Sequence, residues 1–167
     1  MVKKKVLFVC LGNICRSPAA EGVMKSIINQ NNYEKFIEVD SAGTIAYHAG
    51  EPPDERMQLS AKKRGYNLDS LARKFNPKKD FIYFDYIIAM DNENYYTLLS
   101  LDKVSKYTNK IHKVTEFSSI KNYDEVPDPY YGGASGFETV LDILEDACLN
   151  LFNKIKDEIE SGNKKKS

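Results

Sequence analysis

The sequence predicts a single α/β domain in which helices flank a central, mostly four-stranded parallel sheet. The chain has 167 residues, 42% of them hydrophobic, which is enough to bury one sizeable core. Apolar runs of strand length alternate with segments of helical period, and no repeat or long linker interrupts them. This alternation is typical of parallel strands connected by helices. We expect residues 1–161 to form the domain and residues 162–167 to form a basic C-terminal tail.

In the first half of the chain, two expected strands alternate with two expected helices. Residues 4–9 are an apolar run of strand length, and residues 36–39 form a second such run. Between them, a helix is expected from Pro18, because the apolar side chains that follow the proline fall on one helical face. Residues 54–64 form the next helix, which Gly65 ends.

In the second half, residues 83–90 are apolar except at Asp85, as expected of a central strand covered on both faces. A helix is expected over residues 93–101. Asp91 precedes it and is interpreted as its cap rather than as a metal ligand. Residues 111–114 complete the set of four strands.

A long irregular stretch, residues 116–136, separates the last strand from the last helix. Loops of this length in compact domains are often functional. The helix that follows, residues 137–159, keeps apolar side chains at three- and four-residue spacing. Cys148 lies on this apolar stripe, so we expect it in the core rather than in a reactive site.

The composition excludes several classes of function. The 24 basic and 24 acidic residues cancel, so no global field favours nucleic acid or an anionic membrane. The apolar run after Lys3–Lys5 ends at Gly12, far short of a membrane span, and is interpreted as mature sequence rather than a secretory signal. Three cysteines without a disulfide framework favour the reducing cytoplasm. His48 and His112 lack ligand-like spacing, so neither a metal nor another cofactor is expected.

The chemistry-bearing residues are concentrated around Cys10. An apolar strand ends at this cysteine, a short loop follows, and Arg16-Ser17-Pro18 begins a helix. Free backbone N–H groups and the positive end of the helix dipole meet at such a loop, which therefore binds an anion. The same field stabilises a thiolate, so Cys10 is predicted to be a nucleophile aimed at a phosphate group.

The other residues of the loop agree with this interpretation. The planar fork of Arg16 can hold two oxygens of a tetrahedral oxyanion. Ser17 is expected to cap the helix and to reach the thiolate with its hydroxyl group. Gly12 and Asn13 are residue types that tolerate positive φ. The alternative is a buried strand whose cysteines are merely small core residues, but it leaves Arg16 and the loop residues without a role. The ATP-binding pattern is a poor match, because it needs a second glycine and a lysine.

The run from Val9 to Pro18, Val-Cys-Leu-Gly-Asn-Ile-Cys-Arg-Ser-Pro, resembles the signature of the low-molecular-weight protein tyrosine phosphatases. The resemblance covers essentially the whole chain. Further family motifs occur in order and at about the family's distances, at residues 40–44, 53–54, 84–87, 90–91 and 128–131. The resemblance implies a metal-independent hydrolase that removes phosphate from phosphotyrosine in proteins. The reaction would pass through a cysteinyl phosphate and release inorganic phosphate. A monomer or weak dimer is expected, with no nucleic-acid or membrane partner.

The same resemblance implies a phosphate-binding loop that Ser41 supports from outside. The loop residues are Leu11, Gly12, Asn13, Ile14, Cys15 and Ser17. One position departs from the family pattern. Leu71 stands where many members have a histidine that joins the hydrogen-bond network behind the loop, so this network is expected to be shortened or completed by water.

Asp128 is the candidate proton donor. A phenolate leaves phosphorus poorly unless an acid protonates it, and Asp128 lies in the long loop, where Pro129 favours an extended conformation. The family resemblance implies the same residue. The same carboxylate would then take a proton from the water that hydrolyses the cysteinyl phosphate. The alternative is an ordinary turn residue, for which Asp-Pro is common.

The resemblance also implies the walls of a substrate cleft. Tyr130 and Tyr131 would form one wall and Tyr47 the other, with Leu11 lining the depth, and aromatic walls favour an aryl group. The alternative for Tyr47 is simple surface packing. Cys15 is close enough to Cys10 in sequence for a reversible disulfide, or it packs behind the loop.

Three alternative functions use a similar loop. An arsenate reductase needs further cysteines to relay a disulfide, and apart from the two loop cysteines this chain has only Cys148. A phosphoarginine phosphatase typically has threonine where this chain has Ile14, which favours the aryl substrate. A non-catalytic phosphate-binding module would keep Arg16 but would give no role to Cys10 and Asp128.

Overall fold

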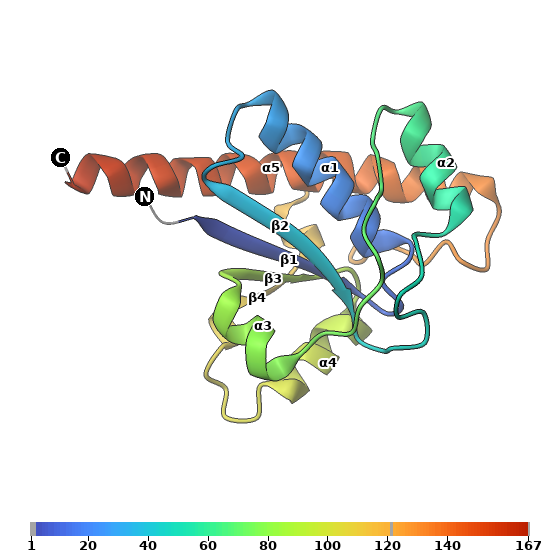
Figure 1. The fold of residues 1–167 in the computed structure, drawn as a ribbon, viewed down its shortest axis with the longest axis horizontal. Helices are drawn as coiled ribbons and strands as arrows, with labels where there is room; N and C mark the ends of the chain where they lie inside the picture. Colours follow the sequence, from blue (N-terminus) through green and yellow to red (C-terminus); the bar gives the residue numbers. More distant parts are fainter. Residues whose placement is uncertain (1–2, 121, 167) are drawn as a thin grey trace.

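Four parallel strands form one sheet in the order β2-β1-β3-β4 (Figure 1). The computed structural model describes residues 3–120 and 122–166, with side chains to residue 162. The strands are β1 (Lys4–Cys10), β2 (Ile37–Gly43), β3 (Tyr86–Ala89) and β4 (Ile111–Lys113). β1 lies between β2 and β3 and ends at Cys10. Cys10 therefore lies in the middle of the carboxyl edge of the sheet, beside Gly43. The predicted α/β class and parallel sheet are confirmed.

Helices cover both faces of the sheet. They are α1 (Arg16–Gln30), α2 (Glu55–Lys63), α3 (Pro77–Tyr83), α4 (Asn92–Leu101) and α5 (Ala134–Lys166), with 3-10 turns at Thr108–Lys110 and Val114–Phe117. α1, α2 and α5 lie together on one face, and α3 and α4 lie on the other (Figure 1). α5 packs along α1 and also contacts α2.

The central strand β1 contributes to two separate cores. Val6 and Phe8 pack with α1 and α5, whereas Leu7 and Val9 pack with α3 and α4, and all four side chains are fully buried. This is why β1 is a continuous apolar run rather than an alternating one. Cys10 continues the first series, so its side chain belongs to the face that carries α1.

The predicted strand over residues 83–90 is wrong at its start. β3 covers only Tyr86–Ala89, and Tyr83 is the last residue of α3. The Asn76 side chain accepts a hydrogen bond from the Lys78 N–H at 3.0 Å, and Pro77 holds the first helical position. These are ordinary helix-start signals, but a helix of 7 residues is too short to show a clear apolar period.

The other elements are found where the sequence predicts them, with different ends: α2 (Glu55–Lys63) and β4 (Ile111–Lys113) are slightly shorter than predicted, whereas β2 and α5 are longer. β2 runs beyond residue 39 to Gly43, because it pairs with β1 up to Cys10. α5 extends from Ala134 to Lys166 and so continues into residues 162–166 of the expected tail, while Ser167 lies outside the described residues. Within residues 3–120 and 122–166, none of the helices has the length and apolar character that crossing a membrane requires.

Candidate active site

The turn from β1 into α1 places a short loop, residues 11–15, at the carboxyl edge of the sheet. Ligands of open parallel sheets lie beyond this edge. Asn13 adopts a left-handed conformation with φ of 59°, as expected. Gly12 does not, so the expectation of a positive φ there is wrong. Its small size serves a close approach instead, because a Cβ atom at residue 12 would lie 3.0 Å from the His48 ring.

Behind the loop, Ser17 joins Cys10 to a buried hydrogen-bond network. The Cys10 Sγ and Ser17 Oγ atoms lie 2.9 Å apart, and Asn13 Nδ2 donates to Ser17 Oγ at 2.8 Å and to Ser41 Oγ at 3.0 Å. The expectation that Ser17 caps α1 is wrong. The helix begins at Arg16 with Cys15 at the cap position and no side-chain cap, since the Ser17 hydroxyl is engaged by Cys10 and Asn13.

The network continues beyond Ser41 to a carboxylate that sequence reasoning missed. Ser41 Oγ donates to Glu21 Oε1 at 2.6 Å, and Lys25 Nζ lies 2.5 Å from the other Glu21 oxygen. Glu21 is 4% exposed, whereas Leu71 is 63% exposed and takes no part. The network therefore reaches the buried carboxylate of Glu21, whose partner Lys25 is 46% exposed, and the position of Leu71 contributes nothing to it.

The Arg16 side chain is buried, with 3% of it exposed, and polar contacts hold its guanidinium. Its Nη1 donates to Asp91 Oδ2 at 2.7 Å and to the Val126 carbonyl at 3.0 Å, and its Nη2 lies 3.5 Å from Asp128 Oδ2. Burial acts to lower the pKa of Arg16, but the charge of Cys10 and the hydrogen bond with Asp91 outweigh this effect and raise the pKa. The guanidinium is therefore a fixed, permanent positive charge next to Cys10.

Asp91 has two functions, of which the sequence predicted one. Its Oδ1 atom accepts from the Asn94 N–H at 2.7 Å and caps α4, as expected. Its Oδ2 atom is the partner of Arg16, which the sequence interpretation missed. Met90-Asp91 follows β3, which is the neighbour of β1 in the sheet. A position at the same carboxyl edge as Cys10 was the sequence signal that could have placed Asp91 near the site.

Asp128 faces Arg16 from the long loop between β4 and α5. Its Oδ1 atom accepts from the Tyr130 N–H at 3.0 Å, which makes a local turn, and its Oδ2 atom is the one directed at Arg16. Asp128 can therefore be both a turn residue and a candidate proton donor, because each role uses a different carboxylate oxygen. On its N-terminal side the loop is attached to the sheet edge by the Val126 N–H, which donates to the Met90 carbonyl at 2.8 Å.

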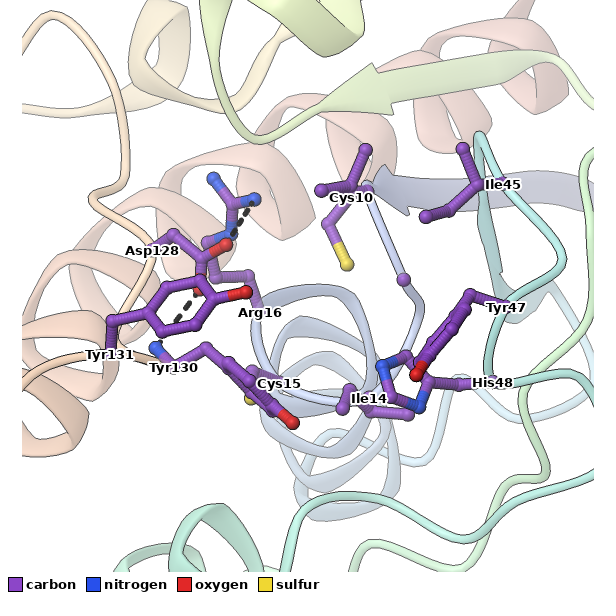
Figure 2. A pocket seen from close by; sticks show the side chains of 12 residues that line it. Cys10, Ile14, Cys15, Arg16, Ile45, Tyr47, His48, Asp128, Tyr130 and Tyr131 are labelled. Carbon is purple, nitrogen blue, oxygen red and sulfur yellow. Dashed lines mark hydrogen bonds and ion pairs between the residues drawn. The ribbon is translucent and has the colours of Figure 1, made fainter.

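These segments enclose one cavity of about 330 Å³ (Figure 2). It is lined by Cys10, Leu11, Gly12, Ile14, Cys15, Arg16, Ile45, Tyr47, His48, Asp128, Tyr130 and Tyr131. The Cys10 sulfur points into the space between Tyr130 and Tyr131 on one side and Tyr47 and His48 on the other (Figure 2). Of the predicted site residues, only Asn13, Ser17 and Ser41 do not line the cavity.

The rim of the cavity is aromatic and open to solvent. Tyr47 is 81% exposed and Tyr131 is 93% exposed, so their rings are free to contact a ligand. Tyr47 meets the His48 ring edge-on at 4.7 Å, and the His48 Nδ1 atom lies 2.6 Å from Glu51 Oε2. Ile45 and His48 were not predicted, and the sequence signal for them was their closeness to Tyr47 along the chain.

The three cysteines are free thiols in different surroundings. Cys148 is fully buried and its sulfur lies 3.9 Å from the Ala20 carbonyl oxygen, in the core as predicted. Burial, followed by the charges of Asp54 and Cys10, raises the pKa of the Cys15 thiol far above its usual range. Cys15 is therefore uncharged near neutral pH and does not compete with Cys10 as a nucleophile.

In the part of the chain that the structure describes, His, Cys, Asp and Glu side chains form no group of three or more that could hold a metal ion. The side chains that line the cavity offer a chemistry of their own. A thiol points into it, a guanidinium of the kind that holds oxyanions lines it, and the partly exposed carboxyl group of Asp128 faces this guanidinium. This set is suited to transfer of a phosphoryl group to sulfur and then to water.

Comparisons with known proteins agree with this chemistry. A model of the family described as low molecular weight phosphotyrosine protein phosphatase matches residues 5–161. The human low molecular weight phosphotyrosine protein phosphatase is 40% identical over 156 residues, which cover 90% of this chain and 95% of the human protein.

Two solved structures have the same fold. A protein tyrosine phosphatase from Entamoeba histolytica, crystallised with Hepes in its active site, is 51% identical with a TM-score of 0.88, over 93% of this chain and 99% of that one. A Drosophila arginine phosphatase is 34% identical with a TM-score of 0.84, over 91% of this chain and 98% of that one. The fold alone therefore does not select between a phosphoryl group on oxygen and one on nitrogen.

Proposed function

The chain belongs to the low molecular weight phosphotyrosine protein phosphatase family, and on this premise we propose that Cys10, Arg16 and Asp128 carry its reaction. The observation that supports this assignment is their convergence. A thiol at the end of β1, a guanidinium in the first turn of α1 and a carboxyl group from the loop before α5 line the same cavity. The chain is thus a protein tyrosine phosphatase whose proposed substrates are phosphotyrosine-containing proteins.

In the first step, the Cys10 thiolate attacks the phosphorus atom and the bond from phosphorus to the phenolic oxygen breaks. Asp128 donates its proton to that oxygen, so tyrosine leaves as a neutral phenol. Ser17 donates its hydroxyl hydrogen to the sulfur 2.9 Å away and so stabilises the thiolate. Arg16 and the N–H groups of the loop hold the phosphoryl oxygens, whose charge increases in the transition state.

In the second step, water attacks the phosphorus of the cysteinyl phosphate and the bond from sulfur to phosphorus breaks. The Asp128 carboxylate takes the proton of the water. Inorganic phosphate leaves, and the Cys10 thiolate and the Asp128 acid are restored. Because Asp91 and Val126 hold Arg16 throughout, its contacts with the phosphoryl oxygens need no rearrangement between the two steps.

The shape and lining of the cavity favour an aryl substrate over the alternatives. Tyr47, Tyr130 and Tyr131 offer ring faces and edges to a phenyl group, and Ile14 adds an apolar contact. Phosphoserine has no ring with which to make these contacts. Phosphoarginine would place a charged guanidinium against Ile14 rather than against a polar side chain.

A phosphopeptide panel assayed in the presence of a chelator tests this substrate class. We expect turnover of phosphotyrosine peptides that the chelator does not change, and much slower turnover of matched phosphoserine and phosphoarginine peptides. Release of inorganic phosphate is the measurement. Faster turnover of phosphoarginine, or loss of phosphotyrosine turnover in chelator, would contradict the proposal.

We also propose Cys15 as the redox partner of Cys10, since both line the cavity. Peroxide converts the Cys10 thiolate to a sulfenic acid, and the Cys15 sulfur then forms the disulfide and expels water. The Cys15→Ser variant should recover several-fold less activity than the wild type when a reducing thiol follows brief peroxide treatment, because its sulfenic acid is oxidised further. Cys148→Ala is the matched control and should recover like the wild type. Equal recovery in Cys15→Ser would exclude the role.

Further proposals concern the setting of the enzyme. We propose that it works in the cytoplasm as a monomer or weak dimer, without a metal or other cofactor, and that residues 1–161 are the catalytic unit. Three free thiols, one of them the proposed nucleophile, support a reducing compartment.

A further inference from the structure

Arg56, in the first turn of α2, contacts the loop that carries Asp128. Its Nη2 atom donates to the Tyr130 carbonyl oxygen at 3.0 Å. Its guanidinium carbon lies 5.5 Å from the centre of the Tyr130 ring and 4.9 Å from that of Phe137 at the start of α5. One side chain thus contacts both the main chain and the ring of the residue two positions after Asp128.

The guanidinium is oriented by Asp54, the cap of α2. Arg56 Nε donates to Asp54 Oδ1 at 3.1 Å and Arg56 Nη2 donates to Asp54 Oδ2 at 2.9 Å, in a two-pronged contact that fixes the plane of the arginine. Burial acts to raise the pKa of Asp54, but the hydrogen bonds from Arg56 outweigh this effect and lower it. The pair is therefore ionised throughout the neutral range.

Asp54 is in turn attached to the phosphate-binding loop. Its backbone N–H donates to the Ile14 carbonyl at 2.8 Å. A continuous set of contacts therefore starts at the loop, passes through Asp54 and Arg56, and reaches the Tyr130 carbonyl. The Tyr130 N–H closes the set by donating to Asp128 Oδ1 at 3.0 Å.

The Asp128 loop is thereby attached on both sides of the carboxylate. Val126 attaches it before Asp128, through the Met90 carbonyl and Arg16. Arg56 attaches it after Asp128, from α2. Proton transfer requires the acid within hydrogen-bond distance of the leaving oxygen, and a loop attached on both sides of the acid restricts that distance more than a loop attached on one side.

We propose that Arg56 is a positioning residue for Asp128: it holds the Tyr130 carbonyl so that the Asp128 carboxyl group faces the leaving oxygen above Cys10. This inference rests on the proposed role of Asp128 as proton donor. Arg56 acts through Asp128 and does not itself touch the phosphoryl group. Replacing Arg56 should therefore lower kcat/KM most for substrates whose leaving group needs a proton.

The test compares two substrates in the variant Arg56→Met, which keeps the length of the side chain and removes its donors. Phenyl phosphate needs a proton on its leaving oxygen, whereas dinitrophenyl phosphate does not. We measure kcat/KM, which reports the steps up to release of the phenol. For phenyl phosphate we expect a fall of about 10-fold or more, and for dinitrophenyl phosphate a change within about 3-fold. Arg56→Lys keeps a positive charge opposite Asp54 and should be intermediate.

Arg64, just after α2, gives a matched control. It pairs with Glu138, Asp142 and Glu145 of α5 and so joins the same two helices without touching the Asp128 loop. Arg64→Met should lower the melting temperature at least as much as Arg56→Met, yet keep the wild-type ratio of the two substrates. An equal fall for both substrates in Arg56→Met, or no fall in either, would overturn the inference.

Asp128→Ala separates this inference from the function on which it rests. If Asp128→Ala itself fails to discriminate between the two substrates, the proton-donor role is wrong. If it discriminates and Arg56→Met does not, only the positioning role is wrong. If both discriminate, the double variant should lose no more on phenyl phosphate than Asp128→Ala alone, because Arg56 acts through that carboxyl group. A further additive loss in the double variant would contradict this route.

Discussion

Replacing Cys10 by serine is expected to lower phosphotyrosine turnover by about 10⁴-fold or more. Serine keeps the size of the side chain and its position 2.9 Å from Ser17, but its hydroxyl group is not ionised near neutral pH. Without a thiolate there is no nucleophile to accept the phosphoryl group, and the remaining residues do not replace it. Steady-state phosphate release from a phosphotyrosine peptide measures the loss.

Binding should survive this substitution, because Arg16 and the loop N–H groups still hold the phosphate. A fluorescence titration with the same peptide should therefore still show saturable binding. Cys148→Ala is the matched control, since it removes a cysteine that is fully buried in the core, and it should keep full turnover. Turnover in Cys10→Ser at more than a few per cent of the wild-type rate would remove Cys10 from the mechanism.

Replacing Asp128 by alanine is expected to slow turnover of phosphotyrosine by about 10²-fold to 10⁴-fold. The variant loses the proton donor of the first step and the base of the second, while Arg16 keeps its contacts with Asp91 and the Val126 carbonyl. The loss should be seen in kcat for good leaving groups as well, because hydrolysis of the cysteinyl phosphate also uses this carboxylate. Presteady-state and steady-state rates together separate the two steps.

Asp124→Ala provides the control for this prediction. Asp124 lies in the same loop and is exposed, but it does not line the cavity around Cys10. Its removal changes the charge of the loop by the same amount as Asp128→Ala and should leave the rate within about 3-fold of the wild type. A similar slowing in both variants would mean that the charge of the loop, rather than one carboxyl group, matters.

The sequence predicted what depends on contiguous residues. The strand, loop and helix around Cys10 lie within one short segment, so the thiol, Arg16 and the anion-binding loop could be placed together before any tertiary contact was known. The buried strands could be predicted for the same reason, since β1 is apolar on both faces. Asp128 and the tyrosines needed the family resemblance, because nothing local brings them to Cys10.

What the sequence did not predict depends on pairs that are distant along the chain. Asp91 and Arg16 are 75 positions apart, and Ser41 and Glu21 are 20 apart, so neither contact has a local pattern. The contact of Ser17 with Cys10 was predicted, but its role as a helix cap was misassigned for a related reason. Its position fits a helix cap, but the cysteine above it and Asn13 compete for the same hydroxyl group. Helix α3 was missed because so short a helix gives only its start signals.

The central claim is that phosphate passes through Cys10, and trapping the phosphoenzyme tests it most directly. The wild-type enzyme is mixed with an aryl phosphate that carries labelled phosphorus, quenched within one turnover, and digested to locate the label. We predict a labelled peptide that contains Cys10, joined through a phosphorus–sulfur bond, and no label in Cys10→Ser. Label on another residue, or full turnover with no labelled enzyme at any time, would contradict the mechanism.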